Sequence, residues 1–149
     1  MSESCKLTQE EADELLHMLK KTLVEAINFP SKNSSTEFDV QGTSKRDIFT
    51  IKIHRGKIRH NKYSMGARIK KDGVILLELH INPGNVHVNP DGEKIIGSHW
   101  HIYKEGYEHR YAFLATDITD DDFVKNTLLF FKRFNIIKEP NVRYQLELL

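Results

Sequence analysis

Histidines give the strongest chemical signal in the sequence. The chain has 149 residues and eight histidines, five of which lie between His80 and His109 in a loop-rich stretch. Histidine titrates near neutral pH without help and is the commonest metal ligand in proteins. The pair His99-x-His101 on a strand would place two imidazoles on one face, about 7 Å apart. This spacing suits either metal chelation with a third ligand or general acid–base catalysis on a phosphodiester.

The five histidines do not form one predicted cluster. His109 lies beyond a predicted turn, and His80 is expected on the polar face of a strand over residues 74–81. Residues 82–97 form a long loop, and long loops in compact domains are usually functional or mobile. If that loop folds back over the strand, it brings together the narrower candidate site: His87, His99 and His101.

The first hypothesis for this site is metal-independent cleavage of RNA. His99 and His101 would share the roles of general acid and general base, and His87 would orient or assist them. Arg68 or Arg110 would stabilise the charge that develops on the phosphorane, and Tyr103 would position the phosphate. This hypothesis needs no cofactor, and a metal ion held by the same three histidines stays open as an alternative.

Positive charge is concentrated in one segment. The net charge of the chain is +1, yet residues 48–71 hold eight Lys or Arg and no Asp or Glu. Such a segment predicts a basic surface that can bind phosphates, although a solvated hairpin without a ligand has the same composition. The residues that we expect to bind nucleic acid are Lys52, Arg55, Lys57, Arg59 and Lys70.

Periodicity predicts an α+β fold with two helices. An apolar stripe starting at a Thr8–Glu11 capping box predicts a helix that stops before Phe29, and a second helix is expected from Thr119. Alternating apolar residues predict an antiparallel sheet of about five strands, with both helices packed on one face. The predicted strands cover residues 47–54, 63–70, 74–81, 98–104 and 107–115.

The turn at Asp72-Gly73 predicts the register of two strands. A three-residue loop, Lys71-Asp72-Gly73, pairs Ile69 with Ile75, Ala67 with Leu77 and Met65 with Leu79, so that all alternating apolar residues share one face. Gly73 then occupies the position where a type I turn with a bulge needs a left-handed residue. The opposite face of the sheet would be polar and open.

Length and composition indicate one domain over residues 1–149, with residues 1–6 as a flexible tail. There is no membrane-length apolar run and no apolar signal region, and the single cysteine, Cys5, cannot form an internal disulfide. These features predict a cytoplasmic protein that does not bind a membrane.

Three segments resemble a family of small bacterial and phage-associated proteins. They are the Thr-Gln-Glu-Glu-Ala-Asp helix start, His-x-Asn-Pro-Asp-Gly at residues 87–92, and His-x-His-Ile-Tyr-Lys-Glu-Gly-Tyr at residues 99–107. Lys104 stands where the family usually has Arg, and Ser98 and Trp100 depart from its Pro-His-Ile-His context. The resemblance names no reaction. It implies a shared site at His87, Asn89, Asp91, His99, His101 and Tyr103.

A setting on mobile elements, which this resemblance implies, would suit a toxin–antitoxin component or a factor that acts against host defence. The leading expectation is therefore a small protein that cleaves or binds RNA. Two alternatives stay open: a non-catalytic, anti-CRISPR-like inhibitor of a nucleic-acid enzyme, and a histidine-ligated metal protein. The expected partner is RNA or another nucleic acid, or a protein such as an antitoxin.

Overall fold

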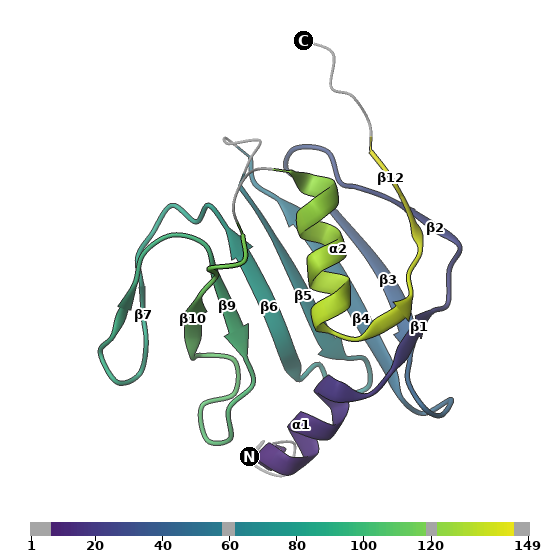
Figure 1. Cartoon of the computed structure of the whole chain (residues 1–149), viewed down its shortest axis with the longest axis horizontal. Coiled ribbons are helices and arrows are strands. Elements are labelled where there is room, and N and C mark those ends of the chain that lie inside the picture. The colour runs from purple at the N-terminus through teal and green to yellow at the C-terminus, as the bar shows by residue number, and fades with distance from the viewer. Residues whose placement is uncertain (1–6, 58–61, 119–121, 145–149) are drawn as a thin grey trace.

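The computed structural model describes residues 7–57, 62–118 and 122–144. It contains a large mixed sheet and two helices, α1 (Gln9–His17) and α2 (Phe123–Arg133). Figure 1 shows α2 lying across one face of the sheet and α1 near one end. The strands are β1 (Lys20–Thr22), β2 (Ala26–Asn28), β3 (Ser35–Gln41), β4 (Ile48–Arg55), β5 (Tyr63–Ile69), β6 (Ile75–Ile81), β7 (His87–Val88), β8 (Lys94–Ile95), β9 (His99–Ile102), β10 (Ala112–Leu114), β11 (Ile136–Lys138) and β12 (Asn141–Arg143).

The main sheet has eight strands in the order β10-β9-β6-β5-β4-β3-β1-β11, so it is larger than the five-stranded sheet that the sequence predicts. All of its pairs are antiparallel except β1 with β11. The predicted strands begin at residue 47, so they leave out β3. In β3 the residues Glu37 and Asp39 face away from the core, and only Phe38 and Val40 are buried.

The first helix is much shorter than its apolar stripe predicts. Its capping box forms as expected, with Thr8 and Glu11 as reciprocal partners, but α1 ends at His17 and the chain continues into β1 and β2. Leu19 and Leu23, which belong to the stripe, are 60% and 49% exposed. Pairing of β1 with β3 and β11 therefore overrides the local helical pattern.

The core lies between the sheet and the helices. Phe130 and Phe131 of α2 and Phe134 at its C-cap are fully buried, and Phe134 meets Phe49 of β4 edge to face at 5.4 Å. Trp100 of β9 stacks on Phe130 at 6.1 Å. α1 packs at one end of this same side, where Ala12 is buried in the core.

The register of β5 and β6 follows the predicted turn. Ala67 lies opposite Leu77 and Met65 opposite Leu79, and a bulge then brings Arg68 opposite Ile75. Gly73 has a φ of 78°, the left-handed value that the turn requires. The predicted pairing of Ile69 with Ile75 was wrong, because the bulge puts Ile75 on the polar face opposite Arg68. The other apolar side chains of these strands face α2, and the alternate side chains form the polar face on the other side.

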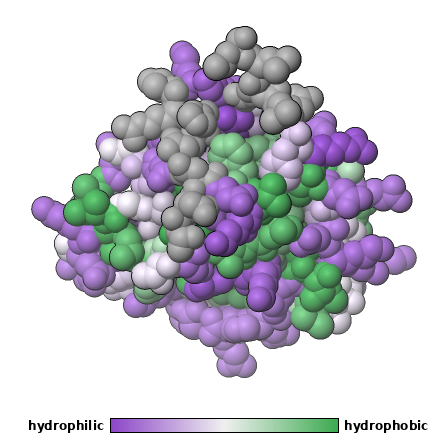
Figure 2. Space-filling view, turned by 45° about the horizontal axis from the view of Figure 1, so that its top comes forward, coloured by the Kyte–Doolittle hydropathy of each residue, from purple (hydrophilic) through white to green (hydrophobic). Residues whose placement is uncertain are grey.

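Among the described residues, no helix is long and apolar enough to cross a bilayer. Figure 2 shows hydrophobic side chains in separate groups among hydrophilic ones on the visible face of the molecule.

Candidate functional site

Two neighbouring strands bring the central histidines together. β6 and β9 are antiparallel, with His80 opposite His99 and Glu78 opposite His101. Because residues two apart on a strand share a face, all four side chains lie on the polar face of the sheet. The intervening residues Leu79 and Trp100 point to the core on the other side.

The imidazole rings of this site are in contact with one another. The ring centroids of His80 and His99 are 5.1 Å apart, and His101 lies 4.8 Å from each of them. One possible ligand nitrogen from each of these three histidines lies within 4.8 Å of the other two. His99 and His101 are buried, and His80 is partly exposed.

Backbone carbonyls fix the tautomers of the two buried histidines. His99 Nδ1 lies 2.9 Å from the carbonyl oxygen of Gly97, and His101 Nδ1 lies 2.8 Å from that of His109. A carbonyl oxygen only accepts hydrogen bonds, so Nδ1 must carry the proton in both rings. The lone pair of each neutral ring is therefore on Nε2, the atom left available to a metal ion or a proton.

His87 reaches the same cluster from the long loop, as the sequence analysis requires for a shared site. Its ring centroid lies 5.4 Å from the ring centroid of His99 and 4.8 Å from that of His101. Its Nε2 lies 3.0 Å from both the Arg110 carbonyl oxygen and Asn89 Oδ1, so this nitrogen is the donor. His87 therefore faces the cluster with a tautomer opposite to that of His99 and His101.

The His-x-Asn-Pro-Asp-Gly motif builds the hairpin that carries His87. Asn89 is buried, and its amide donates to the Ala112 carbonyl at 3.0 Å and accepts from the Ala112 amide at 2.8 Å. Asp91 Oδ1 accepts from the Glu93 amide, and Gly92 has a φ of 93° in the turn that joins β7 to β8. Asn89 thus ties the hairpin to β10, while Asp91 serves the turn.

Glu78 places a carboxylate beside the imidazoles. Its Oε1 lies 3.8 Å from His80 Nε2. Burial opposes ionisation of this group, but the contact with His80 and the nearby His109 and His101 hold its pKa below the usual range. The site therefore places an ionised carboxylate beside the imidazoles.

The pKa values of the two buried histidines are lowered. Burial is the largest cause for both, and the neighbouring imidazoles, His80 above all, add to it. The pKa of His101 falls to about 4, so at neutral pH this ring is uncharged. Neutral imidazole is the form that ligates a metal and that can accept a proton.

His80 and Glu78 belong to the histidine cluster but not to the predicted trio of His87, His99 and His101. The alternation Glu78-Leu79-His80 does place both on the polar face. Their place beside His99 and His101 depends on the pairing of β6 with β9. Seventeen residues separate these two strands in the chain, so periodicity alone does not predict that they are neighbours.

Two of the predicted site residues have other surroundings. The Tyr103 hydroxyl accepts from the Leu7 amide and donates to the Leu7 carbonyl, each at 2.8 Å, so it fastens the chain before α1. Arg55 is buried on the helix side of the sheet, where it donates to the Pro30 carbonyl and lies 5.2 Å from the ring of Phe123. Neither side chain is part of the histidine cluster.

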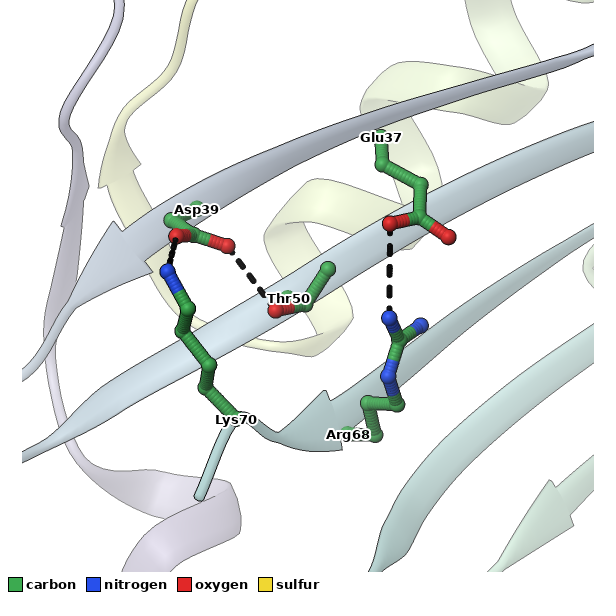
Figure 3. A network of polar contacts seen from close by, with 5 residues as sticks. All are labelled: Glu37, Asp39, Thr50, Arg68 and Lys70. Carbon is green, nitrogen blue, oxygen red and sulfur yellow. Dashed lines mark hydrogen bonds and ion pairs between the residues drawn. The ribbon is translucent and has the colours of Figure 1, made fainter. Parts of the chain in front are cut away.

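The other basic residues are spread over the polar face and its edge. Lys52 and Lys57 are exposed, and Arg59 lies outside the described residues. Figure 3 shows that Arg68 pairs with Glu37 at 3.3 Å, and that Lys70 pairs with Asp39 at 2.6 Å. The acidic residues of β3 thus offset part of the basic charge that the segment 48–71 carries.

Comparison with known proteins gives a family without an assigned reaction. No curated protein and no solved structure matches the chain. A family model described as "Family of unknown function (DUF6978)" matches residues 7–136, which include α1, the histidine cluster and α2. The chain therefore belongs to this family.

Proposed function

We propose that the protein binds one divalent transition metal ion, with zinc as the best match, through His80, His99 and His101. The observation that carries this proposal is the convergence of three ligand nitrogens within 4.8 Å of one another. The carbonyl partners of His99 and His101 support it, because metal-bound histidines usually donate their other N–H to an oxygen.

The three histidines fit a zinc ion after a small movement. Tetrahedral zinc with Zn–N distances near 2.0–2.1 Å holds its nitrogens about 3.4 Å apart. The ligand nitrogens of the three histidines are up to 4.8 Å apart, so they must approach one another by about 1.4 Å to hold the ion. His80, which is partly exposed, is the ring with the most room to turn.

Three protein ligands leave a fourth position open, as in catalytic zinc sites. Glu78 and His87 lie beside the three histidines. A carboxylate there can accept a proton from a metal-bound water, whose pKa zinc lowers. This arrangement favours a hydrolytic site over a closed structural one.

The first test is metal binding by the full chain. Chelator-treated protein is titrated with Zn²⁺ by calorimetry, and Co²⁺ loading is followed by visible absorption. We expect one ion per chain, tetrahedral Co²⁺ bands, and at least tenfold weaker binding after His99→Ala or His101→Ala. His54→Ala, which changes a histidine elsewhere on the same face, is the control. Equal Zn²⁺ affinity of the unaltered protein and the three variants would exclude a metal centre at these histidines.

Metal-independent RNA cleavage is the second candidate, and the contact between the His87 and His101 rings favours it. Their centroids are 4.8 Å apart, and each ring keeps one nitrogen that no backbone carbonyl engages, His87 Nδ1 and His101 Nε2. A proton on one of these nitrogens would make that ring the general acid and leave the other ring as the general base. Purified protein is incubated with RNA in excess chelator. Cleavage that His87→Ala and His101→Ala abolish supports this candidate, and intact RNA under these conditions rules it out.

A further inference from the structure

A glycine in the middle of β5 interrupts the side chains of the polar face. Gly66 lies between Lys52 of β4 and Glu78 of β6, and Glu78 in turn lies opposite His101. A glycine weakens a strand and often marks a place where a ligand approaches the backbone closely.

Neither backbone conformation nor packing explains this glycine. Its φ lies outside the left-handed region, and an added Cβ would meet Glu78 Cγ at 3.6 Å, an ordinary contact. What the missing side chain provides is space. A hollow of about 420 Å³ lies over Gly66, lined by Lys52, His54, Ser64, Arg68 and Glu78 among others.

The residues that line this hollow include two cations, Lys52 and Arg68, and also Glu78 at the edge of the histidine cluster. Lys52 is exposed, and Arg68 makes a half-exposed pair with Glu37 through one nitrogen. Exposed pairs of this kind contribute little free energy, so an anion can displace the carboxylate. Arg68 can then bind a phosphate with two parallel hydrogen bonds.

We propose that the hollow over Gly66 binds a phosphate group of a nucleic-acid strand through Lys52 and Arg68, beside the histidine centre. The nucleic-acid chain would continue from Gly66 of β5 over Glu78 toward His80 of β6 and His101 of β9. The placement next to a metal ion rests on the proposed function, whereas the phosphate contact does not. The hollow is open to solvent along the sheet, which suits a chain that enters and leaves.

The experiment measures binding of a fluorescently labelled single-stranded RNA by polarisation at low salt, with Zn²⁺ and separately with chelator. Lys52→Gln removes one cation, and Gly66→Leu fills the hollow. We expect each to weaken binding about fivefold, the order of one lost phosphate contact. Glu37→Gln removes the competing carboxylate and is expected to tighten binding about twofold.

Matched controls separate this effect from general charge and strand stability. Lys45→Gln removes an exposed cation from the β3–β4 turn, and Gly66→Ala adds a methyl group that fits. Both are expected to bind like the unaltered protein. Equal weakening by Lys45→Gln and Lys52→Gln, or no effect of Gly66→Leu, overturns the proposal.

A parallel arm with DNA of the same sequence identifies the strand. Equal affinity for both would assign the contact to the shared phosphodiester, and a preference for RNA would place the 2′-hydroxyl in the contact. Variant effects that persist in chelator support the hollow even if the metal titration fails. Loss of metal binding with intact RNA binding would therefore refute only the metal centre.

Discussion

The side-chain amide of Asn89 pairs with both backbone groups of Ala112, as a neighbouring strand would. The Ala112 amide donates to Asn89 Oδ1 at 2.8 Å, and Asn89 Nδ2 donates to the Ala112 carbonyl at 3.0 Å. β10 is the edge of the main sheet, and an edge with open backbone groups invites pairing with another chain. One side chain thus closes part of this edge and holds the His87 hairpin beside it.

Asn89→Ala is expected to destabilise the protein by about 1–3 kcal/mol, because it leaves both groups of Ala112 without their partner. The change should also speed hydrogen exchange of the Ala112 amide. Urea unfolding and exchange measured by NMR test this, with Asn85→Ala in the same loop as the control. An unchanged exchange rate at Ala112 would contradict it.

Acidification of the metal-free protein is expected to lower its stability. The pKa of His101 is about 4 in the folded chain and 6.5 otherwise, so the unfolded chain binds the proton more readily. The stability that this ring contributes is present above pH 6.5 and is lost as the pH falls toward 4. Between pH 7 and pH 5 the loss is roughly 2 kcal/mol.

Urea unfolding of chelator-treated protein at both pH values measures this dependence. His101→Gln should flatten it, and His54→Gln should leave it unchanged. A slope that does not respond to His101→Gln would assign the pH dependence to other groups.

Lys20→Met is expected to destabilise the fold by about 1–3 kcal/mol. Lys20 is buried, and its ammonium donates to the carbonyls of Leu16, Met18 and Phe134. Burial lowers its pKa to about 7, while three carbonyl acceptors favour the charged form. Lys21→Met, an exposed neighbour, is the control for thermal and urea unfolding. Equal stability of both variants would show that these contacts contribute nothing.

Trp100 should report metal binding. It is the only tryptophan, and it lies between His99 and His101 in the chain with its ring on the core side. Cu²⁺ or Ni²⁺ at the histidine centre should quench its fluorescence, whereas Zn²⁺, with a filled d shell, should not. His99→Ala should abolish the quenching. Quenching that persists in this variant would place the ion elsewhere.

The polar face was largely predictable from the sequence, because it depends on alternation and on one turn. The loop at Asp72-Gly73 fixed how Ala67 and Leu77 pair, and that register in turn placed Arg68, Glu78 and His80 on one face. Local patterns of this kind carry their own geometry.

Long-range pairing was not predictable in the same way. The stripe through Leu19 and Leu23 has the spacing of a helix, but β1 pairs with strands that lie far away in the chain. The same limitation hid the role of His80, which depends on β9 as its neighbour. Arg55 shows a third case, since counting charge along the chain does not reveal which face of a strand a cation occupies.

The parallel pair of β1 and β11 has a consequence for how the chain is made. The Lys20 ammonium donates to the Phe134 carbonyl, which lies 114 residues further along the chain. Neither this hydrogen bond nor the pairing of β1 with β11 can form until both segments have been synthesised. During synthesis on the ribosome the N-terminal segment emerges first, and β1 keeps one unpaired edge until β11 has been made. The sheet can therefore be completed only after residues 136–138 have left the ribosome. We expect the pairing of β1 with β11 to form late in co-translational folding.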